Sequence, residues 1–130
     1  MSQPREIGAD EYVSQYGSRL TGEPVFWDHL KPADIDGLSA IIGQVTPAEG
    51  RRRVRGPRSG PPTRDDGIRY ALVADLEKEG FRVTDTGWPG NTKHVSISYP
   101  GEWDDTVAGK FNKCFGAPLW HEEAKQGGPP

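Results

Sequence analysis

Two alternating segments between residues 81 and 99 restrict the fold of this chain more than any other pattern in it. Apolar and polar residues alternate along Phe81–Thr86 and again along Lys93–Tyr99. A period of two is typical of a strand with one buried face. The stretch Gly87–Asn91 between them is rich in turn-forming residues. The pattern therefore predicts an antiparallel hairpin that buries the face carrying Val95 and Ile97.

Helical patterns flank this hairpin on both sides. The segments Asp65–Glu79 and Glu102–Phe115 each repeat apolar residues four positions apart, which indicates amphipathic helices. The sequence thus predicts an α+β unit over residues 65–120, in helix-strand-strand-helix order, with the hairpin packed by the helices. Two strands alone are marginal in water, so we expect the N-terminal half or a partner to complete the sheet. The apolar positions are Ile68, Leu72 and Leu76 in the first helix, and Trp103, Val107, Phe111 and Phe115 in the second.

The N-terminal segment, residues 1–45, is expected to be mostly helical. Tyr12, Tyr16 and Leu20 are four positions apart and indicate a short helix. A second helix is expected over Ala33–Ile42, and a strand over Ser39–Val45 is the alternative for that stretch.

The composition changes abruptly in residues 46–64. Between Arg51 and Arg64 the chain has six arginines and no acidic residue, among several prolines and glycines. Such a block has little apolar surface to bury, so we expect a flexible connector between the N-terminal segment and the α+β unit. Residues 121–130, which end in Gly-Gly-Pro-Pro, are expected to form a disordered tail.

The arginine segment is also the most distinctive chemical feature. Guanidinium groups make bidentate contacts with phosphates, and a basic arm gains affinity for nucleic acid by releasing counterions. The segment is therefore either a solvated linker or an arm that binds RNA, DNA or an acidic protein. It has no aromatic residue to stack on bases, and the net charge of −3 does not indicate a dedicated nucleic-acid binder. The candidate binding residues are Arg51, Arg52, Arg53, Arg55, Arg58 and Arg64.

His94 is the candidate for a catalytic residue. It shares the polar face of the second predicted strand with Ser96 and Ser98, where it could act as a general base or simply be a surface residue. This His-x-Ser strand resembles half of the signature of two-histidine phosphoesterases, and the other half is missing. The helix-strand-strand-helix order around a strand histidine is similar to HicA-type messenger-RNA interferase toxins. That resemblance, which covers the order of elements and one histidine, implies a small ribonuclease.

The remaining candidates restrict the chemistry further. Trp88, at the predicted hairpin tip, either anchors a partner or folds back over a helix. The single cysteine, Cys114, excludes an intramolecular disulfide and a cysteine-based zinc site. No phosphate-binding glycine motif or metal-ligand spacing occurs, so we expect neither a metal nor a cofactor. No apolar run is long enough for a membrane span, and Met1–Asp10 lacks a signal-peptide core, so we expect a soluble cytoplasmic protein.

These observations favour a small, non-catalytic binding or regulatory protein that acts through a protein partner, of an accessory, phage-encoded or toxin-neutralising type. The unfinished two-stranded sheet motivates this hypothesis, because an open edge accepts a strand from another chain or from a second copy. The alternative is a nucleic-acid-binding protein or small ribonuclease-like toxin that uses the arginine segment and His94. Neither hypothesis involves a membrane.

Overall fold

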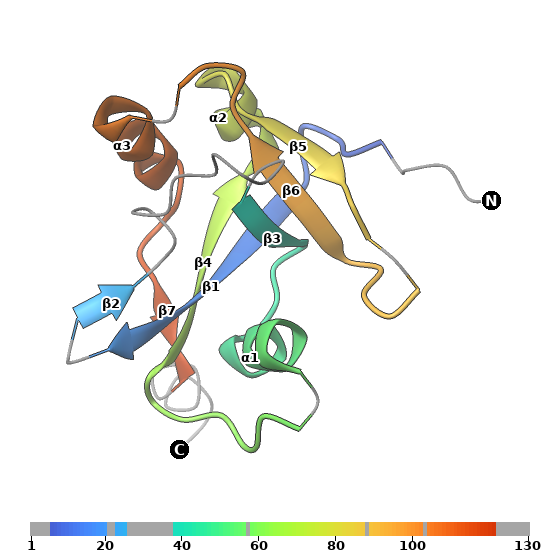
Figure 1. Ribbon diagram of the computed structural model, residues 1–130, viewed down its shortest axis with the longest axis vertical. Helices are drawn as coiled ribbons and strands as arrows, with labels where there is room; N and C mark the ends of the chain where they lie inside the picture. Colours follow the sequence, from blue (N-terminus) through green and yellow to red (C-terminus); the bar gives the residue numbers. More distant parts are fainter. Residues whose placement is uncertain are drawn as a thin grey trace.

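The computed structural model of the chain describes residues 6–20, 23–25, 38–56, 58–87, 89–102 and 104–121. Within them, a seven-stranded sheet in which every pairing is antiparallel carries three short helices (Figure 1). The strands are β1 (Tyr12–Leu20), β2 (Glu23–Val25), β3 (Leu38–Ile42), β4 (Asp66–Leu72), β5 (Arg82–Asp85), β6 (His94–Ser98) and β7 (Leu119–Trp120), and the helices are α1 (Pro47–Arg55), α2 (Val73–Lys78) and α3 (Asp105–Lys113). The strand order is β5-β6-β3-β1-β4-β7, and β2 pairs with the end of β1.

This sheet shows that the expected fold class, a helix-strand-strand-helix unit preceded by a mostly helical segment, is wrong. Tyr12–Leu20 forms the central strand β1 instead of a helix. The expected helix over residues 33–42 contains β3, so the alternative strand assignment was closer; residues 33–37 lie outside the described residues. In the expected helix over residues 65–79, only Val73–Lys78 is helical, because Asp66–Leu72 forms β4.

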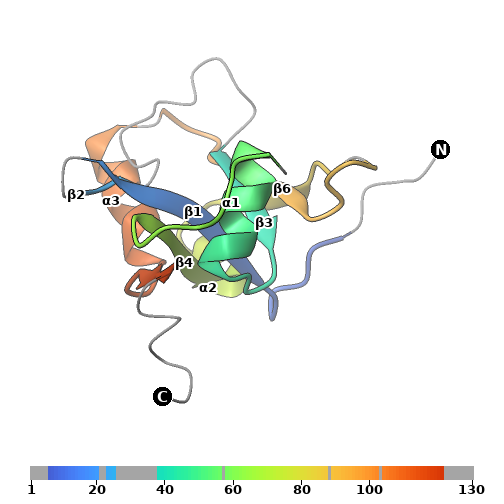
Figure 2. The same cartoon turned by 90° about the horizontal axis from the view of Figure 1, so that it is seen from below.

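Residues 13–17 of β1 are buried on both faces of the strand, because helices cover the two sides of the sheet. Helices α2 and α3 pack on one face, and α1 packs on the other face against β1 and β4. Figures 1 and 2 show α1 near the opposite end of the sheet from α2 and α3. The larger core, under α2 and α3, includes Val13, Leu38, Ala40, Ala71, Leu76, Val95, Ile97, Val107 and Phe111. The smaller core, toward α1, consists of Tyr16, Ile41, Val45 and Ile68.

Helix α1 occupies part of the segment that was expected to be a flexible connector over residues 46–64. The Thr46 side chain accepts a hydrogen bond from the Glu49 backbone N–H at 3.1 Å, and Pro47 takes the first helical position. Thr-x-x-Glu is a typical helix start, and proline suits the first turn because that turn's N–H groups have no partner inside the helix. The helix ends at Gly56, whose φ of +97° favours glycine.

The positions of the predicted hairpin and the last helix agree with the structure. Strands β5 and β6 pair in register, and Val95 and Ile97 are buried as expected. Asp104 caps α3 by accepting a hydrogen bond from the Val107 N–H at 2.9 Å. Strand β3 pairs with β6 and joins the hairpin to the rest of the sheet. Among the described helices, none has both the length and the apolar character to cross a membrane.

Candidate functional site

His94 lies in a chain of hydroxyl groups on the polar face of the sheet. Its Nδ1 is 2.7 Å from Thr86 Oγ1, and its Nε2 is 3.1 Å from Ser39 Oγ. Thr86 Oγ1 is in turn 2.9 Å from Ser96 Oγ. Because hydroxyls both donate and accept, these contacts suit either neutral tautomer of the ring. His94 therefore connects β6 to β3 and to the residue after β5, a grouping that the sequence alone could not reveal because it depends on strand pairing.

Next to this face, a charged cluster ties α1 to the loop between β5 and β6. Glu49 Oε2 accepts hydrogen bonds from Arg53 Nε at 2.7 Å and from Lys93 Nζ at 3.2 Å. Arg53 also donates to Asn91 Oδ1 at 3.0 Å. The hydrogen bond from Arg53, aided by Lys93, holds the pKa of Glu49 below its ordinary value despite partial burial. Arg53 is thus engaged within the chain.

A buried carboxylate, that of Asp66, ties α1 to the sheet. Arg51 Nη1 lies 3.0 Å from both Asp66 oxygens, and the Thr63 N–H donates to Oδ2 at 2.8 Å. The Tyr16 hydroxyl donates to Oδ1. Burial raises the pKa of Asp66, but the hydrogen bonds from Tyr16, Thr63 and Arg51 outweigh it, so the pKa lies below its ordinary value. Arg51 also donates to the Ser59 carbonyl at 2.6 Å, which fixes the chain after α1.

The six arginines therefore divide into two groups. Three of them donate hydrogen bonds within the chain: Arg51 to Asp66, Arg53 to Glu49, and Arg55 Nε to the Tyr16 hydroxyl at 3.0 Å. Burial and the neighbouring Asp66 raise the pKa of Tyr16, so its hydroxyl stays protonated at neutral pH. The other three, Arg52, Arg58 and Arg64, are exposed. Three of the predicted binding arginines thus hold α1 in place. Within the described residues, Arg53 is the one of the six that donates a hydrogen bond to the loop that leads to His94.

Arg69, on β4, is buried and reaches side chains of β1 and α3. Its Nε donates to Gln15 Oε1 at 2.7 Å, and its Nη2 donates to Asn112 Oδ1 at 2.8 Å. The guanidinium carbon lies 4.4 Å from the centroid of the Phe115 ring, within cation–π range. This cluster fastens α3 to the sheet.

The other predicted candidates contribute less. Trp88 lies outside the described residues. Burial, with the nearby carboxylates of Glu79 and Asp75, raises the pKa of the Cys114 thiol to about 11, which makes it a poor nucleophile. The described part of the chain has no group of three or more histidine, cysteine or acidic residues that could hold a metal ion.

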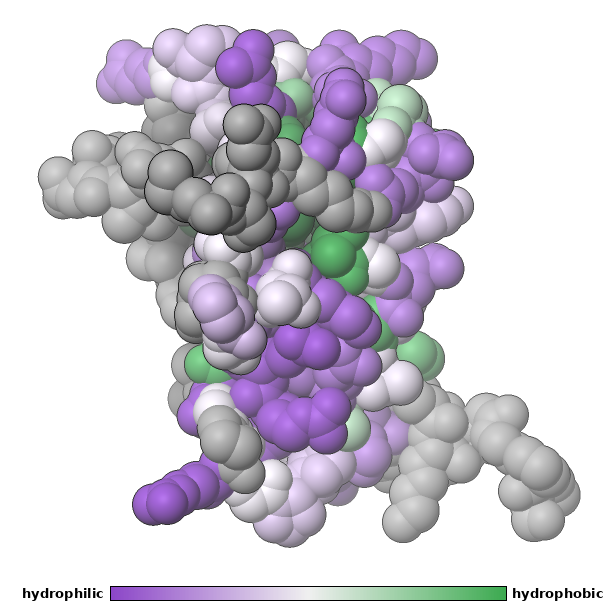
Figure 3. Space-filling model, turned by 90° about the vertical axis from the view of Figure 1, so that its right-hand side faces the viewer, coloured by the Kyte–Doolittle hydropathy of each residue, from purple (hydrophilic) through white to green (hydrophobic). Residues whose placement is uncertain are grey.

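The strongest candidate for a binding surface is the outer edge of β5, the side facing away from β6. Within the described chain β5 ends the strand order, so this side is not paired with another strand there. Figure 3 views the side of the molecule that carries β5, and hydrophilic residues cover most of its described surface. A pocket of about 470 Å³ adjoins the start of the strand. Its lining residues are Glu77, Gly80, Phe81, Arg82, Ser98, Tyr99 and Pro100.

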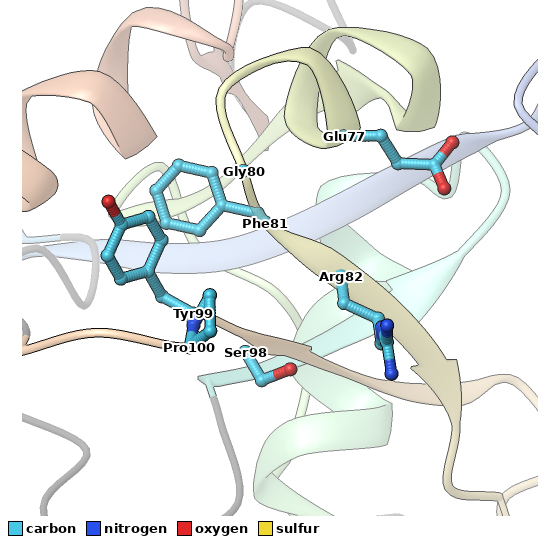
Figure 4. Close-up of a pocket in the computed structure, with 7 residues that line it drawn as sticks. All are labelled: Glu77, Gly80, Phe81, Arg82, Ser98, Tyr99 and Pro100. Atoms are coloured by element: carbon cyan, nitrogen blue, oxygen red, sulfur yellow. The ribbon is translucent and has the colours of Figure 1, made fainter.

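The pocket combines aromatic and charged walls. The rings of Phe81 and Tyr99 have centroids 5.2 Å apart, and Figure 4 shows them together at one end of the pocket. The side chains of Glu77 and Arg82 lie on opposite sides of the β5 ribbon in the same view. The sequence predicted the hairpin but not this site, because only the pairing of β6 with β3 shows which side of the hairpin remains an edge.

Comparisons with known proteins give no independent information on this site. No protein-family model, curated protein or solved structure matches the chain. The functional argument therefore depends on the geometry of the described residues.

Proposed function

We propose that this protein binds a protein partner through the outer edge of β5 and does so without catalysing a reaction. The observation that carries the proposal is an edge strand that begins beside a pocket of about 470 Å³. An extended segment of a partner can add to such an edge as a further strand, with main-chain hydrogen bonds for affinity and a pocket for selectivity.

The register of the hairpin indicates which backbone groups the partner would use. The Thr86 N–H donates to the His94 carbonyl at 3.2 Å, and Thr84 and Arg82 follow at alternate positions opposite Ser96 and Ser98. Hydrogen-bonded and non-hydrogen-bonded pairs alternate in an antiparallel ladder. Val83 therefore directs its N–H and C=O outward, where a partner strand can bond to both groups.

The nucleic-acid alternative has weaker support from the geometry. Three of its six arginines already donate hydrogen bonds within the chain, and two of those three, Arg51 and Arg53, are paired with carboxylates. The exposed Arg52, Arg58 and Arg64 are the ones left for phosphate contacts. Salt-dependent binding of short RNA or DNA that weakens when these three become serine would favour this alternative over the β5 edge.

The edge can be tested by removing one backbone donor. Val83→Pro deletes the outward N–H, and proline is tolerated on the solvent side of an edge strand. Val83→Thr keeps the N–H and a similar side-chain shape, so it is the matched control. Peptides selected from a phage-displayed library on the wild-type protein should bind Val83→Thr and lose binding to Val83→Pro. Failure to select any peptide, or equal binding by a folded Val83→Pro protein, would contradict the proposal.

Self-pairing of β5 in a second copy is tested separately, by light scattering of the wild type and of Val83→Pro. A wild-type dimer that the proline variant abolishes would make the partner another copy of this chain. A monomer at every concentration leaves a different protein as the partner.

A further inference from the structure

Two oppositely charged side chains stand on the two faces of the sheet at the β5 edge. Glu77 belongs to α2, the helix that covers the larger core. Arg82 points to the other face, since it pairs with Ser98 while the adjacent pair, Val83 and Ile97, faces the core. Both charged side chains are exposed, and both line the pocket. Figure 4 shows the β5 ribbon passing between them.

Neither of these charges is neutralised by the described part of the protein. Glu77 and Arg82 make no side-chain hydrogen bond or ion pair there, with each other or with other residues. This differs from the cluster of Glu49, Arg53 and Lys93 at the loop end of the hairpin, in which the charges pair internally. The pocket therefore offers a negative and a positive group at the same edge, both available to a ligand that carries the opposite charges.

We propose that the β5 edge selects a partner strand in which a basic residue is adjacent to an acidic residue. The inference rests on the proposed function, because it describes the segment that adds to β5. Successive side chains of a strand point to opposite faces of the sheet, so two adjacent residues of the partner meet Glu77 and Arg82 respectively. The basic residue lies on the α2 face, and the acidic residue lies on the other face, where a carboxylate can accept two hydrogen bonds from the guanidinium of Arg82.

The rest of β5 extends this pattern by cross-strand pairing. The partner residue opposite Val83 lies on the core face and is apolar, because Val83 packs against the larger core. The residue opposite the exposed Thr84 is polar. Read from the position opposite Phe81 to the position opposite Thr84, the partner presents basic, acidic, apolar and polar residues. A parallel strand has this order as Lys-Glu-Val-Thr, and an antiparallel strand has it as Thr-Val-Glu-Lys.

The test uses synthetic peptides that carry each of these cores between Thr-Val repeats, together with versions in which lysine and glutamate are exchanged. The proteins are the wild type, the charge-reversed variant E77K/R82E, and Glu79→Lys as a control for a reversal that does not line the pocket. One matched peptide should bind the wild type and lose about fivefold or more in affinity to E77K/R82E, since each exposed ion pair contributes modestly. The exchanged peptide should recover that affinity on E77K/R82E, and Glu79→Lys should behave as the wild type does.

The outcomes distinguish a failure of the charge pattern from a failure of the proposed function. Recovery by the exchanged peptide, lost at high salt, supports the charge pattern. If Val83→Pro abolishes peptide binding but the charge reversals do not change it, the charge pattern is wrong and the β5 edge remains a binding site. The absence of binding by every peptide, together with a failed library selection, overturns both.

Discussion

Replacement of Asp66 by asparagine tests whether its buried carboxylate holds α1 on the sheet. The Asp66 side chain is 2% exposed and accepts hydrogen bonds from Tyr16, Thr63 and Arg51. Asparagine has the same shape, but its NH₂ group would face one of these donors, and Arg51 would lose its counterion. Breaking one side of a buried ion pair costs about 3–5 kcal/mol. We expect a loss of this size in the free energy of unfolding, out of a total of about 5–15 kcal/mol for a typical domain.

The pH dependence of this loss has a defined sign. The pKa of Asp66 is lowered in the folded protein, so its contribution to stability is fully present above the unfolded value of about 3.9. The contribution declines as the pH falls through the lowered folded pKa. The difference in unfolding free energy between wild type and Asp66→Asn should therefore be constant from neutral pH to about pH 5 and shrink below about pH 4.

Urea unfolding followed by tryptophan fluorescence and circular dichroism measures both quantities. The matched control is Asp65→Asn, which removes a carboxylate from the adjacent, exposed position. That variant should stay within about 0.5 kcal/mol of the wild type. If Asp66→Asn unfolded at the same urea concentration as Asp65→Asn at neutral pH, the assignment of Asp66 as the anchor of α1 would be refuted.

Three further predictions test other parts of the packing. Gly67→Ala places a Cβ 2.6 Å from the Trp120 ring and should lower the free energy of unfolding in urea by about 1–3 kcal/mol. Gly109→Ala, in an open position of α3, should raise it by about 0.5–1 kcal/mol. Equal effects of the two substitutions would contradict the close approach of β4 and β7. Tyr16→Phe removes the hydroxyl that links Arg55 to Asp66 and should cost about 1–3 kcal/mol in the same assay, and a neutral result would show that the link is weak. Because the pKa of the Cys114 thiol is raised to about 11, this thiol should react with an aromatic disulfide reagent at pH 8 far more slowly in the folded protein than in the urea-unfolded protein. Equal reaction rates would contradict the raised pKa of Cys114 in the folded protein.

Strands β1 and β4 were expected to be helical because a spacing of four residues is ambiguous. Positions four apart lie on one face of a helix and also on one face of a strand. Tyr12 and Tyr16 on β1, and Ile68 and Leu72 on β4, are such pairs. These two strands are covered by helices over part of both faces, so they lack the polar alternation that identified β5 and β6. Their β-branched and aromatic residues were the remaining indication of strand structure.

Helix α1 in the arginine segment was not predicted, for a different reason. Its average composition indicated a connector, but the local pattern Thr46-Pro47-Ala48-Glu49 is a helix start that could have been recognised in the sequence. The pairing of Arg51 with Asp66 could not be predicted, because the two residues meet only when α1 packs across β1 and β4. The polar face around His94 was predicted within β6, whereas its contacts with Ser39 and Thr86 depend on neighbouring strands.

The central position of β1 has a consequence for how the chain acquires its structure. Tyr16 and its partner Asp66 are 50 positions apart, and β4 is the strand with which β1 makes its longest pairing. A ribosome must therefore synthesise the 50 positions that separate Tyr16 from Asp66 before β1 can meet its main neighbour. Folding dominated by such distant pairings is slow, typically on the order of milliseconds to seconds. During that interval β1, whose Val13 and Tyr16 are buried in the folded protein, lacks its partners, and we expect it to be the segment most in need of protection by a chaperone.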